Sequence, residues 1–298
     1  MNLLPVSKVR ELSKLSPARA AGQIALEYLG ITFAIFLCER FWHPALYLVT
    51  FAFLGARYLA LAVLMHDAAH YRLFANRAVN DWVGSYLCGA PALLSMQDYR
   101  HGHLAHHAHL GTPEDPELPF RKMVSVMPQA GVLIVGSLIG ISGLMLVVSV
   151  NRGFKRALGL ATIPAVLLLA WLAPSAARLI ALYWLLPYFL WTAGANVLRT
   201  FAEHYDVDLE HASTPERVYA ARVIRPSWLA RLFIAPNNVG YHLDHHLYPS
   251  VPFYRLPELH ALLLEHAGYR ERTRDFTGYP DVISDHLSRV RSAEAPRP

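Results

Sequence analysis

The stretch ALYLVTFAFLGARYLALAVLMHDAAH, residues 45–70, joins a long apolar run directly to two histidines. The run at residues 45–65 is long enough to cross a bilayer as a helix, which takes about 20 apolar residues. His66 and His70 follow it four positions apart, so on a continued helix both side chains lie on one face. The segment predicts a membrane helix that ends in a pair of metal ligands.

Two further histidine clusters, HLAHH at residues 103–107 and HLDHH at residues 242–246, also lie near apolar segments. In each, the first histidine shares a helix face with the last two. Such a cluster offers more nitrogens than a site with one ion needs, because its adjacent pair can reach two neighbouring metals. We therefore expect a dinuclear centre. The expected ligands are His66, His70, His103, His106, His107, His242, His245 and His246.

Residue type alone does not choose the metal, because imidazole binds iron, zinc, copper and nickel. A zinc site normally closes at about four ligands, fewer than the clusters provide. No cluster contains the Glu-x-x-His pairing of soluble di-iron bundles. Cys38 and Cys88 are isolated, which gives an iron–sulfur or zinc-ribbon site no support.

In their order and spacing, the three clusters resemble the histidine boxes of the membrane fatty acid desaturase superfamily, HxxxH, HxxHH and HxxHH. The resemblance covers residues 61–266 and includes HHAHLGTPEDPEL at 106–118, RTFAEHY at 199–205 and NNVGYHLDHHLYPSVPFYRLPELH at 237–260. It implies that His204 is a ninth ligand. Asn238 resembles an asparagine found in parts of that family.

The resemblance implies two iron ions, with O2 as co-substrate, in an enzyme that desaturates a fatty acyl or related lipid chain. A lipid or carotenoid hydroxylase or ketolase on the same scaffold is the alternative, because the boxes do not distinguish these outcomes. A metal transporter is a more remote alternative. The chain has no cysteine cluster to carry electrons, so a separate ferredoxin-, rubredoxin- or cytochrome-like carrier is implied.

Carboxylates near the histidines are candidate acceptors for the second ring N–H of a metal-bound imidazole, which fixes ring orientation. The alternative is that they are solvated cytoplasmic charges. Separately, we expect Arg199 to form a salt bridge with one of them. The main candidates are Asp67, Glu203 and Asp244, followed by Asp98, Glu114 and Asp115. His101 and His109 flank the second box, and the histidines expected to be structural or on the surface are His43, His211, His260, His266 and His286.

Composition favours an all-α, multi-pass integral membrane protein, with 54% hydrophobic and 16% charged residues. The net charge of +5 is attributed to basic segments at the membrane edge and not to nucleic-acid binding, because no basic patch is interleaved with aromatic residues. A basic cytoplasmic surface could attract an acidic electron carrier. We expect a cytoplasmic segment at 1–19, one membrane domain at 20–269 and a polar, partly disordered tail at 270–298.

Four transmembrane helices in two hairpins are expected, with the histidines in a cytoplasmic cap. The first hairpin is formed by residues 20–38 and 45–65, and the basic residues before it place the N-terminus in the cytoplasm. The run at 82–96 is short and is expected to lie in the interface. The basic loop at 151–156 implies that 131–150 does not fully cross, so 157–173 and 179–198 form the second hairpin.

Glu27 and Arg57 are charges inside the first hairpin. Each lies about 11 Å from the cytoplasmic end of its span at 1.5 Å rise per residue. We predict that they pair, because an unpaired charge inside a bilayer is costly. The alternative is that one of them reaches the interface by extending its side chain.

Overall fold

A computed structural model of the protein describes residues 3–118, 168, 171–204 and 217–294. The described residues are mostly helical. In the N-terminal half the elements are α1 (Val6–Leu12), α2 (Pro17–Arg40), α3 (Pro44–Ala69), α4 (Arg77–Trp82), the π-helix η1 (Val83–Gly89), the 3-10 turn η2 (Ala90–Ala92) and α5 (Met96–His109). Further along they are α10 (Pro174–Ile180), the π-helices η4 (Ala181–Leu185) and η5 (Pro187–Thr192), α11 (Ala193–His204), β1 (Val223–Ile224), α13 (Trp228–Phe233), α14 (His242–Leu247), η6 (Phe253–Arg255), α15 (Leu256–Leu263), α16 (Ala267–Arg270), β2 (Asp275–Phe276) and α17 (Tyr279–Glu294).

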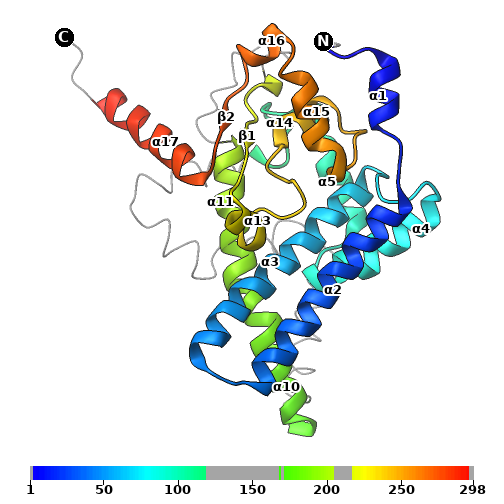
Figure 1. Ribbon diagram of the computed structural model, residues 1–298, viewed down its shortest axis with the longest axis vertical. Coiled ribbons are helices and arrows are strands. Elements are labelled where there is room, and N and C mark those ends of the chain that lie inside the picture. The colour runs from blue at the N-terminus through cyan, green and yellow to red at the C-terminus, as the bar shows by residue number, and fades with distance from the viewer. Residues whose placement is uncertain (1–2, 119–167, 169–170, 205–216, 295–298) are drawn as a thin grey trace.

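Three helices in the described part of the chain are long and apolar enough to cross a membrane: α2, α3 and the continuous helix Pro174–His204, which includes α10 and α11. Proline at the first turn starts both α2 and α3, where its missing N–H costs nothing. The Ser16 hydroxyl caps α2 and the His43 ring caps α3. In Figure 1 these helices form the long lower part of the molecule, and α14, α15 and α16 lie above them.

The segment expected at the interface does not form one continuous helix. Leu93 takes a left-handed conformation with φ of 53°, which ends the 3-10 turn, and Ser95 then caps α5. Residues 119–167 lie outside the described residues, so the expectations for 131–150, for the basic loop and for most of 157–173 do too. Of the four expected spans, the structure therefore contains both helices of the first hairpin and the second helix of the other.

The predicted pair inside the first hairpin is confirmed. Arg57 Nη1 donates to Glu27 Oε2 at 2.8 Å, and the two side chains are 11% and 1% exposed. Arg57 Nη2 also donates to the Leu232 carbonyl at 2.7 Å, which ties α13 to the hairpin. The charge of Glu27 is thus neutralised by a group that is itself hydrogen-bonded.

α3 lies at the centre of the molecule, and its contact with the helix Pro174–His204 is unusually close. A Cβ on Gly55 would lie 2.5 Å from Trp191 Cβ, so only glycine permits this approach. The Thr192 hydroxyl donates to the Gly55 carbonyl at 2.7 Å across the same contact. The two helices run in the same direction (Figure 1). His66 near the end of α3 and His204 at the end of α11 therefore lie beside the same cavity.

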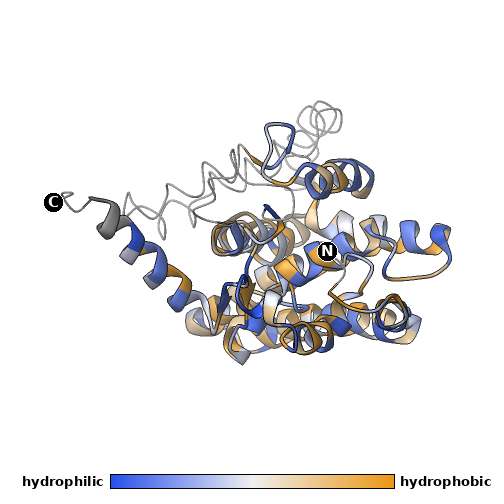
Figure 2. Ribbon diagram, turned by 90° about the horizontal axis from the view of Figure 1, so that it is seen from above, coloured by the Kyte–Doolittle hydropathy of each residue, from blue (hydrophilic) through white to orange (hydrophobic). Residues whose placement is uncertain are grey.

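The C-terminal part departs from the sequence expectation in two ways. β1 and β2 pair in parallel, a small exception to the expected all-α fold. The segment expected to be a polar, partly disordered tail contains β2 and α17 as far as residue 294, and Val282 is fully buried in a cluster with Val197 and Phe201. Tyr279 and Val282 anchor the beginning of α17 in this core, although most of the helix is hydrophilic (Figure 2).

Candidate metal centre

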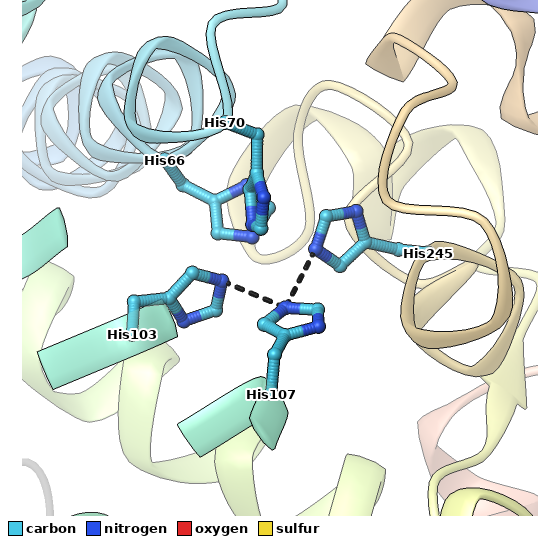
Figure 3. Close-up of side chains that lie close together, drawn as sticks. All are labelled: His66, His70, His103, His107 and His245. Atoms are coloured by element: carbon cyan, nitrogen blue, oxygen red, sulfur yellow. Dashed lines mark hydrogen bonds between the residues drawn. The ribbon is translucent and has the colours of Figure 1, made fainter. Parts of the chain in front are cut away.

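Nine histidines converge in two groups near the ends of the long helices. In each group one nitrogen per ring lies within 4.8 Å of all the others. The first group is His66, His70, His103, His107 and His245, and the second is His106, His204, His242 and His246. Figure 3 shows the first group, in which rings from α3, α5 and α14 point toward one another. The structure therefore brings together all nine histidines that the sequence analysis expects to be metal ligands.

In each HxxHH cluster the two adjacent histidines belong to different groups. His107 belongs to the first and His106 to the second, while His245 belongs to the first and His246 to the second. Neighbouring residues on a helix point about 100° apart, so an adjacent pair can face two centres at once. This arrangement is the one that the HxxHH spacing predicts.

The distances within each group fit a bound ion. In the first, His107 Nε2 lies 3.0 Å from His103 Nε2 and 3.1 Å from His245 Nε2. In the second, His242 Nε2 lies 2.7 Å from His204 Nε2 and 3.1 Å from His246 Nε2. Two nitrogens bound at about 2.1 Å to one ion at right angles lie roughly 3 Å apart. Among the described residues, the buried Nε2 of His70 has no hydrogen-bond partner, as expected of a ligand atom.

The environment favours neutral imidazoles, the form that binds metal. Burial lowers the pKa of His70 to about 4 and that of His107 to about 3. Burial, and then the neighbouring rings, lower the pKa of His245 and His246 well below the ordinary value. The ring nitrogens can therefore offer lone pairs at neutral pH.

Asp115 orients His106. His106 Nδ1 lies 3.0 Å from Asp115 Oδ1, and both side chains are buried. Asp115 also accepts the backbone N–H groups of Gly111 and Glu117, each at 2.9 Å, which fixes the carboxylate in place. Because the Asp115 carboxylate accepts a hydrogen bond from Nδ1–H, the tautomer with Nε2 available for metal is favoured.

Asp67 and Glu203 have similar positions. His66 Nδ1 lies 3.3 Å from Asp67, whose other oxygen accepts the Phe253 backbone N–H at 2.9 Å. His242 Nδ1 lies 3.6 Å from Glu203. The expectation that Arg199 pairs with one of the carboxylates is confirmed, because Arg199 Nη1 donates to Glu203 at 2.6 Å.

Asp244 lies inside the third box but faces away from the histidine groups. Its two oxygens contact His260 Nδ1, at 2.9 Å, and the Tyr269 hydroxyl. Burial opposes the charged form of His260, but hydrogen bonds to Asp244 and Asp275 outweigh it and raise the pKa of His260 to about 9. This network fixes α14 against α15 and α16.

Asn238 has a structural contact. It has a φ of 57°, and its Nδ2 donates to the Phe253 carbonyl at 3.1 Å. The remaining candidates are more peripheral: Asp98, Glu114, His101 and His109 are exposed. Of the histidines expected to be structural, His43 caps α3, His286 packs on Phe201, and His211 lies outside the described residues.

Glu117 is a site residue that sequence reasoning missed. Its carboxylate lies 3.7 Å from His103 Nδ1 and 3.9 Å from His106 Nε2. The signal was present in the acidic run after the second box, where Glu117 follows Asp115 by two positions. The sequence does not show that Glu117 lies beside the histidines, because this position depends on how the turn after α5 folds.

A cavity of about 260 Å3 adjoins both histidine groups. Leu59 and Val63 of α3 line one side, before His66 on the same helix. Thr192 and Asn196 line it from the helix that ends at His204. A substrate in this cavity would lie directly beside the rings of both histidine groups.

Comparison with known proteins identifies the family. The sequence model of the fatty acid desaturase family matches residues 41–278. The dihydrorhizobitoxine desaturase of Bradyrhizobium elkanii is 27% identical over 95% of this chain and 88% of its own. A β-carotene ketolase from a Paracoccus species is 28% identical over 80% and 89%, and a ceramide hydroxylase from Caulobacter vibrioides is 30% identical over 34% and 29%. The match covers the three histidine boxes and the helices that position them, and the chain belongs to the fatty acid desaturase family.

Proposed function

We propose that the protein is a membrane-bound di-iron oxidoreductase that uses O2 and external electrons to desaturate a fatty acyl or related lipid chain. The observation that carries the proposal is the convergence of nine histidine nitrogens in a group of five and a group of four. Imidazole is a common iron ligand, and the family match favours an enzyme over a metal transporter. Two irons held there would supply an oxidant able to remove hydrogen from an unactivated C–H bond.

The protein's own residues hold and orient the ligands. The buried rings present neutral nitrogens, and Asp67 and Asp115 accept from the Nδ1 atoms of His66 and His106. Glu203 lies 3.6 Å from His242 Nδ1. The cavity would position one carbon of the substrate beside the histidines.

Hydroxylation or ketone formation on the same scaffold is the second candidate. The relatives named for these reactions, a β-carotene ketolase and a ceramide hydroxylase, favour it. Whether the substrate loses a second hydrogen or gains oxygen depends on small differences in the position of the reacting carbon.

We further propose a multi-pass topology with the histidine groups at the cytoplasmic face. The basic segment before α2 supports this orientation. On that face a separate ferredoxin-, rubredoxin- or cytochrome-like carrier would deliver electrons.

The test is expression in a lipid-producing host, followed by mass spectrometry of total lipids and pigments. The control is a His106→Ala and His107→Ala double variant, which removes one ligand from each group. A product lighter than its parent by two hydrogens, absent from the variant, supports desaturation. A product heavier by one oxygen supports hydroxylation. Iron bound equally by both proteins, with no O2-dependent product from either, would contradict the proposal.

A further inference from the structure

One wall of the cavity beside the histidines is polar along its whole length. The helix that ends at His204 contributes Tyr188, Thr192, Asn196, Arg199, Thr200 and Glu203 to the cavity lining. These residues are three or four positions apart, so they form one stripe over roughly 20 Å of helix. The stripe lies within a helix apolar enough to span a membrane.

The part of α3 before His66 contributes an apolar wall. Leu59, Ala62 and Val63 line the cavity there, and Leu94 from the segment before α5 adds to the apolar lining. The cavity therefore combines an apolar wall with the polar stripe. A saturated hydrocarbon chain would suit the apolar wall and supply no hydrogen-bond partner to the polar atoms of the stripe that lack one.

Several polar atoms of the stripe remain unsatisfied within the described part of the chain. The Tyr188 hydroxyl and Glu203 Oε1 are buried and have no hydrogen-bond partner there. Arg199 donates from both terminal nitrogens, to the Glu203 carboxylate and to the side-chain oxygen Oδ1 of Asn196 at 3.0 Å. Within the described residues its buried Nε has no partner. Water can solvate such groups while the cavity is wet. Their desolvation by an alkyl chain would be costly unless the ligand supplied new partners.

We infer that the substrate carries uncharged hydrogen-bonding groups, hydroxyl or amide, on the segment that occupies this cavity, and is not an unbroken hydrocarbon chain there. The inference rests on the proposed function, because it assigns the cavity to the substrate. An amphipathic segment would place its polar edge on the stripe and its apolar edge on α3. At about 30 Å3 for each water-sized group, the cavity of about 260 Å3 holds a segment of roughly nine such groups.

Three probes of matched length test the inference without turnover. They are decane, a decanol with its hydroxyl at mid-chain, and N-butylpentanamide. Binding is measured to the iron-loaded protein in lipid nanodiscs and corrected for partition into empty nanodiscs. We expect the amide and the alcohol to bind roughly 3- to 10-fold more tightly than decane for each hydrogen bond formed.

Variants of the stripe identify the source of the preference. Tyr188→Phe with Asn196→Leu should remove the preference while decane binding is kept or strengthened, which also shows that the double variant is folded. Leu59→Ala, on the apolar wall, should weaken all three probes alike. If the double variant does not fold, Thr200→Val provides the same comparison at a third position of the stripe.

The outcomes separate this inference from the proposed function. Equal or tighter binding of decane by the unaltered protein, or a preference unchanged in the stripe variants, would overturn the inference. Iron content and O2-dependent product are measured on the same samples. Absence of an O2-dependent product from the iron-loaded protein, alongside a persisting preference, would contradict the proposed function and leave the polar recognition intact.

Discussion

At the residue scale, the contact between His106 and Asp115 shows how a carboxylate prepares one ligand. Asp115→Asn keeps the size of the side chain but removes the charge that stabilises an Nδ1–H donor on His106. We expect iron affinity at the group of four to fall about 10- to 100-fold, as outer carboxylate partners commonly contribute. Metal analysis after dialysis against a graded chelator measures the loss. Glu114→Gln, one position away and exposed, is the matched control and should retain iron.

Arg57 allows a second prediction, about stability. Arg57→Gln leaves the buried Glu27 carboxylate without its ionic partner, and breaking a buried pair on one side costs about 3–5 kcal/mol. Unfolding of the detergent-solubilised protein should show this loss, and adding Glu27→Gln should recover part of it. Arg178→Gln, which breaks the more exposed pair with Glu39, should cost much less. Equal losses in the two single variants would contradict the argument from burial.

At the element scale, the packing of α14 against α15 depends on the charge of His260. The pKa of His260 in the folded protein is about 9, above its ordinary value near 6.5. Its contribution to stability is therefore complete below about pH 6.5 and is lost as the pH rises through about 9. Unfolding measured across this range should show a stability difference between wild type and His260→Gln that shrinks as the pH rises. A difference that stays constant with pH would mean that His260 acts only by packing.

The helices and box histidines could be predicted from the sequence because their signals are local. An apolar run of membrane length and spacings of three and four residues are enough to place His66, His70 and their counterparts on common faces. The direction of Asp244 could not be predicted in this way, because it depends on how α15 and α16 fold back to bring His260 and Tyr269 to it. The pairing of β1 with β2 joins segments about fifty residues apart, and neither two-residue strand has a periodicity to detect.

At the scale of the whole molecule, the hairpin of α2 and α3 makes the proposed topology testable. Its turn lies at the opposite end of the long helices from α1 and α15 (Figure 1). Single cysteines replacing the exposed Ser7 and Glu265 should react with an impermeant thiol reagent from the cytoplasmic side only. A cysteine at the exposed His43 should react only from the other side. The native cysteines, Cys38 and Cys88, are buried and give little background. Labelling of all three positions from one side would contradict the topology.

The division of adjacent histidines between two groups has a consequence for assembly of the centre. His106 and His107 share one turn of α5, and His245 and His246 share one turn of α14, so neither group can be ordered without ordering part of the other. Binding of the first ion orders both turns and loses the corresponding conformational entropy. Binding of the second ion then loses less entropy, because its ligands are already ordered. Loading should therefore be cooperative, with molecules that hold a single iron scarce throughout a titration. Native mass spectrometry at half-saturating iron would show this as two populations, one with no iron and one with two.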